Sequence, residues 1–195
     1  MRILVTIALI LLALPLWAQA LKLGDVKSHP TRFLSGVAAG VLAYELGHVI
    51  VANSERYSVD VAGGSLIYSG PPMSPAQRVQ ISSAGFQTQW LLSEAILRDH
   101  EARHPGEPMD PAAAGVVCSH LLISAAYLTV LRDNLHGDLR AVNQATGRST
   151  SELATMITLP ALLDYWRLTA RDVPAWVPTV SATSKGVGIG ACWRF

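Results

Sequence analysis

The stretch that decides the fold is residues 33–52, FLSGVAAGVLAYELGHVIVA. Its twenty largely apolar residues match the length of a helix that crosses a bilayer. Two ionisable residues interrupt it, Glu45 and His48, which are three positions apart and therefore share one face of a helix. Because ionisable groups are costly in such a segment, they suggest a functional site. Gly36 and Gly40 have the spacing that lets another helix approach closely.

The composition of the whole chain is that of an apolar, membrane-associated protein. Of its 195 residues, 50% are hydrophobic and 15% are charged, whereas ordinary soluble domains carry about 25% charged residues. The formal net charge of +1 gives no electrostatic footprint for nucleic acid, so we expect no nucleic-acid partner. The two cysteines, Cys118 and Cys192, are too few for a disulfide framework, although an oxidising compartment would permit them to pair.

The first twenty residues have the features of a secretory signal peptide. Arg2 precedes an unbroken apolar run over residues 3–17, and Ala18-Gln19-Ala20 has the small-x-small form of a cleavage site. We therefore expect a signal peptide over residues 1–20, followed by a single helical domain over residues 21–195. The expected location is the bacterial cell envelope, either membrane-associated or periplasmic. An uncleaved membrane anchor is the alternative interpretation.

The domain is expected to be mainly α, as a membrane-associated helix bundle with minor β structure. The expected long helices cover residues 33–53, 76–98, 112–131 and 151–171, and a short helix covers residues 135–144. A short β-hairpin is expected within residues 57–68, directly after the first helix. The tail, residues 178–195, alternates small and apolar residues and predicts a C-terminal β-strand or hairpin.

The strongest chemical motif is Tyr44-Glu45-Leu46-Gly47-His48, inside the first long helix. Zinc metallopeptidases carry His-Glu-x-x-His on a helix, where the two histidines share a face and bind zinc while the glutamate acts on the bound water. Here the glutamate and the second histidine are present, and Tyr44 replaces the first histidine. Glu45 and Tyr44 are therefore the candidate catalytic residues, and His48 is the first candidate metal ligand.

The surrounding sequence resembles the site-2-protease-like intramembrane zinc metallopeptidases. Residues 41–52 resemble their motif helix, which in that family is followed by a β-hairpin and by a helix that opens with Ala-Gly-Pro. Residues 83–89, SAGFQTQ, resemble this second helix, with Phe86 in place of the proline. Residues 134–138, NLHGD, are a loose counterpart of the segment that supplies an aspartate ligand. The resemblance implies an intramembrane helical fold, a zinc site with His48 and Asp138 as ligands, and Glu45 as the general base.

Three interpretations of this site are open. In an active site, His136 or His120 would supply the missing ligand, so that zinc and its bound water are retained. In a degenerate site, Tyr44 fills the ligand position and hydrogen-bonds Glu45 or His48, and the protein is a pseudoenzyme without zinc. We favour this interpretation, because a phenol with a pKa near 10 is a poor zinc ligand and catalytic zinc normally keeps three protein ligands. In the third, Glu45 and His48 only satisfy each other within the bundle.

A literal His-Glu-x-x-His match lies elsewhere, at residues 100–104, HEARH. The segment is charged and is followed at once by Pro105-Gly106, whereas a metalloprotease helix continues past its second histidine. We interpret it as a helix end within a loop region.

The alternative function is a non-enzymatic envelope protein that uses its helices and C-terminal strand for assembly. Its partners would be membrane lipid and a membrane or envelope protein. The two functions differ in one geometric feature, which is whether His120, His136 or Asp138 lies beside Glu45 and His48.

Overall fold

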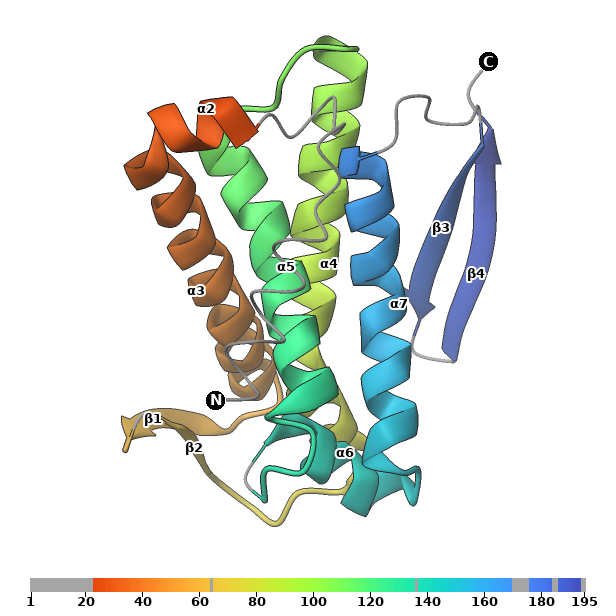
Figure 1. Ribbon diagram of the computed structural model, residues 1–195. Coiled ribbons are helices and arrows are strands. Elements are labelled where there is room, and N and C mark those ends of the chain that lie inside the picture. Colours follow the sequence, from red (N-terminus) through yellow and green to blue (C-terminus); the bar gives the residue numbers. More distant parts are fainter. Residues whose placement is uncertain (1–22, 64, 136, 170–175, 184–185, 194–195) are drawn as a thin grey trace.

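The computed structural model describes residues 23–169 except residues 64 and 136, together with residues 176–183 and 186–193, and it is mainly helical (Figure 1). Four long helices lie side by side: α3 (Pro30–Ser54), α4 (Pro75–Arg103), α5 (Pro111–Thr129) and α7 (Thr150–Thr169). A short helix, α2 (Leu23–Ser28), precedes α3, and another, α6 (Asp138–Thr146), lies at the opposite end of the bundle. The expected helical class is confirmed. The expected signal peptide lies outside the described residues.

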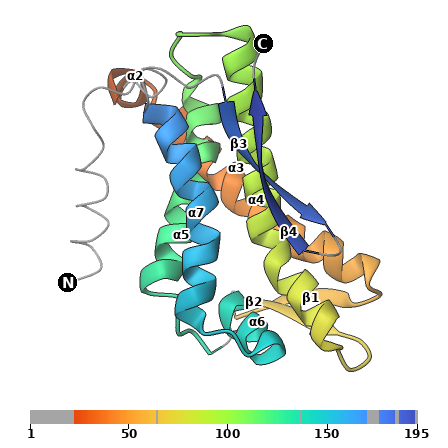
Figure 2. The ribbon, with the colours of Figure 1, turned by 90° about the vertical axis from the view of Figure 1, so that its right-hand side faces the viewer.

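A two-stranded antiparallel hairpin follows the motif helix, as predicted. It consists of β1 (Ser58–Ala62) and β2 (Ser65–Ser69), with Val59 opposite Tyr68. Its inward residues pack with Tyr57 and Ile81 against the end of α3, so the hairpin is fixed to the helices. The two views show that it lies at the same end of the bundle as α6 (Figures 1 and 2). A second antiparallel pair, β3 (Trp176–Thr183) and β4 (Gly186–Trp193), follows α7.

The helices α3 and α5 approach closely at small residues. A Cβ atom added to Gly36 would lie 1.9 Å from the backbone oxygen of Ala112, and one added to Gly40 would lie 1.9 Å from Ser119 Oγ. The close helix approach predicted from the Gly36–Gly40 spacing is confirmed, with α5 as the partner.

The start of α4 agrees with the helix predicted over residues 76–98, but its end does not. The Ser74 side chain accepts a hydrogen bond from the Gln77 backbone, and the Gln77 side chain accepts one from the Ser74 backbone, which is a capping box. The helix continues to Arg103, five residues beyond the predicted end. The expectation of a loop from His100 onward was therefore wrong for residues 100–103, whereas residues 104–110 lie outside the helices. Burial of Glu101 against Arg167 of α7 stabilises this added turn.

Two of the helices, Pro30–Ser54 and Pro111–Thr129, are long and apolar enough to cross a membrane by length and composition. Both also pack within the bundle, which buries one face of each. Cys118 of α5 is a free cysteine, and its suggested partner, the side chain of Cys192, lies outside what the structure describes.

Candidate functional site

Three of the predicted site residues meet at the hairpin end of the bundle. Tyr44 and His48 lie one turn apart on the buried face of α3, and only 4% and 2% of their surfaces are exposed. Asp138, the first residue of α6, faces both. The Tyr44 hydroxyl donates a hydrogen bond to Asp138 Oδ2 at 2.5 Å, and His48 Nε2 lies 3.5 Å from the same oxygen. The structure therefore places the loosely matched aspartate beside the motif helix.

Sequence reasoning missed a fourth member of this site, Tyr127 of α5. Its hydroxyl donates to Asp138 Oδ2 at 2.7 Å and lies 3.1 Å from the Tyr44 hydroxyl. Phe86 of α4 packs edge-on against both tyrosine rings, with centroid distances of 5.2 and 4.9 Å. A tyrosine 83 positions from Tyr44 has no local spacing that would link the two. We call Tyr44, His48, Tyr127 and Asp138 the tyrosine–aspartate site.

The elements around the site explain why Asp138 reaches it. The carboxylate stands in the first turn of α6, where the helix dipole favours a negative charge. Leu139 and Val142 of the same helix are buried in one apolar cluster with Tyr44 and Phe86, so packing orients α6. The apolar face of α6 therefore determines where the carboxylate is held.

His48 is held in a defined orientation. Its Nδ1 lies 2.6 Å from the backbone oxygen of Ile81, and because a carbonyl only accepts, Nδ1 is the protonated nitrogen. The ring packs against Gly85 of α4, where an added Cβ would lie 2.4 Å from His48 Nε2 and 2.7 Å from the Tyr44 ring. Glycine at this position is therefore required for the approach of α4 to the motif residues.

Glu45 lies next to the site but is exposed at the surface of α3. The prediction that Tyr44 hydrogen-bonds Glu45 or His48 was wrong, because the long phenol side chain reaches across to Asp138 and Tyr127 instead. His48 likewise bonds the Ile81 carbonyl and not Glu45. The third interpretation, in which Glu45 and His48 bond each other, is therefore not the arrangement found.

Tyr68 of the hairpin is affected by the charges at this end of the bundle. Burial, and then the negative charges of Asp138 and Glu45, raise the pKa of the Tyr68 phenol well above its usual value. Tyr68 of β2 therefore lies within the field of both carboxylates.

His120 does not join the site. His120 Nδ1 lies 2.7 Å from Asp164 Oδ2 of α7, and both side chains are 2% exposed. The suggestion that His120 substitutes for a ligand beside His48 is thus corrected, because Asp164 on the neighbouring helix is its partner. His136 lies outside the described residues.

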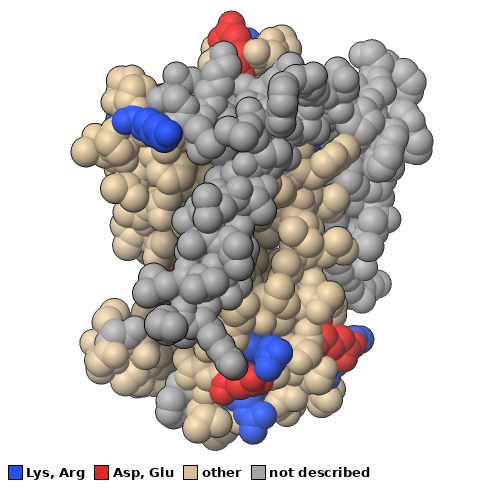
Figure 3. Space-filling view, in the orientation of Figure 1, with Lys and Arg blue, Asp and Glu red and all other residues tan. Residues whose placement is uncertain are grey.

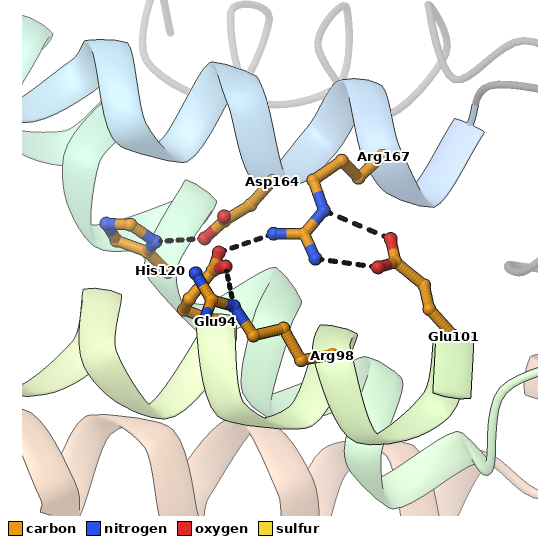
Figure 4. A network of polar contacts seen from close by, with 6 residues as sticks. All are labelled: Glu94, Arg98, Glu101, His120, Asp164 and Arg167. Carbon is orange, nitrogen blue, oxygen red and sulfur yellow. Dashed lines mark hydrogen bonds and ion pairs between the residues drawn. The ribbon is translucent and has the colours of Figure 1, made fainter. Parts of the chain in front are cut away.

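The His120–Asp164 pair belongs to a buried charge network that was not predicted (Figure 4). Arg167 of α7 donates two hydrogen bonds to Glu101, at 3.1 and 3.0 Å, and also binds Glu94. Arg98 bonds the same Glu94 from one turn away. The network connects α4, α5 and α7, and it extends from the middle of the bundle to the end of α4.

The same contacts explain the literal motif at residues 100–104. Glu101, the residue in the glutamate position, is held by Arg167 and is not available as a base. His100 contacts the Glu107 backbone at 3.1 Å, and His104 contacts the Glu107 carboxylate at 3.2 Å. These contacts are those of a capped helix end.

The tyrosine–aspartate site does not fit a catalytic zinc ion. Such an ion normally takes three protein ligands from histidine, cysteine and carboxylate, with a water in the fourth position. Here two such ligands, His48 and Asp138, converge, and the third place holds the Tyr44 phenol hydrogen-bonded to Asp138. Among the described residues, no group of three or more His, Cys, Asp and Glu side chains is placed to hold a metal.

Comparison with known proteins adds no relative. The chain matches no protein-family model, no curated protein and no solved structure. The features of the chain that bear on function are the chemistry of the tyrosine–aspartate site and the surface of the bundle.

Proposed function

We propose that the protein is a membrane-embedded, site-2-protease-like protein of the bacterial cell envelope whose peptidase site is degenerate. It would bind a membrane or envelope protein partner without hydrolysing it. The observation that carries this proposal is the 2.5 Å hydrogen bond from Tyr44 to Asp138. Tyr44 stands where the motif has its first histidine, and Asp138 stands where the family has its aspartate ligand. The two are hydrogen-bonded to each other.

The likeness to the peptidases rests on more than the motif. The motif helix is followed by a β-hairpin, and α4 meets it at Gly85 within the segment that resembles the family's second helix. Asp138, distant in sequence, lies 3.5 Å from His48 Nε2. Three features that the resemblance implies thus occur together, and the substituted residue is Tyr44.

The outer surface of the bundle supports membrane insertion. Four large apolar side chains of α3 are 54–65% exposed: Leu34, Leu42, Leu46 and Ile50. Soluble monomers rarely expose a continuous apolar surface of this kind. On the described part of the face drawn in Figure 3, charged side chains gather at the two ends, with an uncharged band between them. Lipid is therefore the proposed environment of the bundle.

The proposal is tested by zinc content and peptidase activity. The full-length protein is purified in detergent without a histidine tag, loaded with zinc, and assayed by elemental analysis and for cleavage of transmembrane peptides. We expect the wild-type chain to retain far less than one zinc ion and to cleave nothing. Tyr44→His, which completes the motif, is expected to retain more zinc. His104→Ala, at the exposed literal motif, is the control and should change neither property.

One result would overturn the proposal. It is a wild-type protein that retains one zinc ion per chain, loses it on His48→Ala, and cleaves peptides in a manner abolished by Glu45→Gln.

A further inference from the structure

His48 has the orientation of a metal ligand but faces an acceptor. Its Nδ1–H donates to the Ile81 carbonyl, which is the contact that commonly orients a metal-binding histidine. In the neutral ring Nε2 then carries a lone pair, and it lies 3.5 Å from Asp138 Oδ2, another acceptor. His48 Nε2 is buried and has no hydrogen-bond partner in the described structure. A positive charge between these two atoms would give His48 Nε2 a partner and would balance the Asp138 carboxylate.

The oxygens around this position have the spacing of a coordination shell. The Tyr44 hydroxyl, the Tyr127 hydroxyl and Asp138 Oδ2 lie 2.5, 2.7 and 3.1 Å from one another. Neighbouring oxygens around an octahedral cation with bonds of about 2.0 Å are about 2.8 Å apart. Three helices, α3, α5 and α6, therefore bring three oxygens together, and His48 Nε2 lies 3.5 Å from one of them, Asp138 Oδ2.

We infer that Tyr44, His48, Tyr127 and Asp138 form a binding site for a hard trivalent cation, ferric iron. Two phenolates and one carboxylate carry three negative charges, which balance the charge of the ion in a buried place. Phenolate is a known ligand of protein-bound iron, whereas zinc favours histidine and thiolate. The Asp138 side chain is 20% exposed, which gives the site a side open to solvent.

Binding is a ligand exchange without electron transfer. Each phenol loses its proton and forms one bond to iron, so two protons leave for every ferric ion bound. The hydrogen bonds from the two tyrosines to Asp138 break as the protons depart. Burial disfavours the deprotonated, charged form of a phenol. A bound cation stabilises that form and so offsets the cost of burial. This inference rests on the proposed function, because it names what the degenerate site holds in place of zinc.

The test uses the colour of iron-bound tyrosinate. Tag-free, full-length protein in detergent is loaded with ferric citrate, freed of excess iron by gel filtration, and examined by elemental analysis, visible absorption and resonance Raman spectroscopy. We expect about one iron per chain, a phenolate-to-iron charge-transfer band, and tyrosinate vibrations. Tyr44→Phe and Tyr127→Phe should each weaken the band and lower iron affinity by at least about tenfold.

Tyr57→Phe is the matched control, because Tyr57 is a buried tyrosine near the same end of the bundle whose hydroxyl meets Gln77 at 3.4 Å. It should leave the band unchanged. A wild-type protein without the band after loading would overturn the inference, whatever the variants do. So would a band that persists when Tyr44 and Tyr127 are both replaced. Neither result depends on zinc retention or peptide cleavage, so this inference and the proposed function fail separately.

Discussion

Arg167 is the cation on which the buried charge network depends. Only 2% of its side chain is exposed, and it binds the carboxylates of both Glu94 and Glu101 from the neighbouring helix. Arg98 shares Glu94 but is 55% exposed. Buried and exposed ion pairs differ in their effect on stability, because a buried charge that loses its partner keeps its desolvation penalty. These two arginines therefore allow a matched comparison at one carboxylate.

We expect Arg167→Met to lower the free energy of unfolding by roughly 3–5 kcal/mol, because the largely buried Glu101 would lose this cation and Glu94 would keep only the exposed Arg98. Arg98→Met should lower it by less than about 1 kcal/mol, because its pair is exposed to solvent. Denaturation of both variants in detergent, followed by circular dichroism, measures the difference. Equal losses of stability in the two variants would contradict this account.

The contact between α3 and α5 depends on glycine because the two backbones lie close together. Gln89 of α4 adds polar contacts at the same place, donating to the Gly40 carbonyl at 3.3 Å and to Ser119 Oγ at 3.2 Å. Gly40 therefore lies where three helices meet. A larger side chain there has to separate α3 from α5 and break these hydrogen bonds.

We expect Gly40→Leu to destabilise the bundle by about 3 kcal/mol, the upper end of the usual cost of overpacking. Thermal denaturation in detergent measures the change. Val41→Leu, at the next position of α3 where the side chain is 40% exposed, is the control. Its effect should stay within about 0.5 kcal/mol. The packing argument fails if Gly40→Leu is as stable as the control.

At the scale of the whole molecule, the outer face of α3 should lie against lipid. Leu42 and Ile50 are 62% and 65% exposed, and lysine at the centre of a membrane helix costs about 2.5–3.5 kcal/mol. We expect the wild-type protein to remain in membranes after alkaline carbonate extraction. The Leu42→Lys, Ile50→Lys double variant should be released in part.

The matched control for this extraction is Ser54→Lys, because Ser54 is exposed at the very end of α3, where lysine can reach water. It should stay in the membrane fraction. Complete release of the wild-type protein by carbonate would count against membrane embedding.

The sequence by itself determined the helical class, the hairpin after the motif helix and the close approach at Gly36 and Gly40. These features are local, because hydrophobic runs, turn residues and small-residue spacing act within a few residues of one another. It also singled out Glu45 and His48, since an ionisable pair in an apolar helix is visible without any partner, and Tyr44, which stands where the motif has its first histidine.

Only the tertiary structure decided which distant side chains complete each site. Tyr127 reaches Tyr44 because α5 packs against α3, and nothing in its own segment shows this. Asp138 reaches Tyr44 because α6 packs against α4, and the sequence offered only the loose resemblance of residues 134–138 for it. The partner of His120 turned out to be Asp164, on a helix 44 positions away along the chain. Contacts between helices depend on how apolar faces bury one another, and this packing is a property of the assembled bundle.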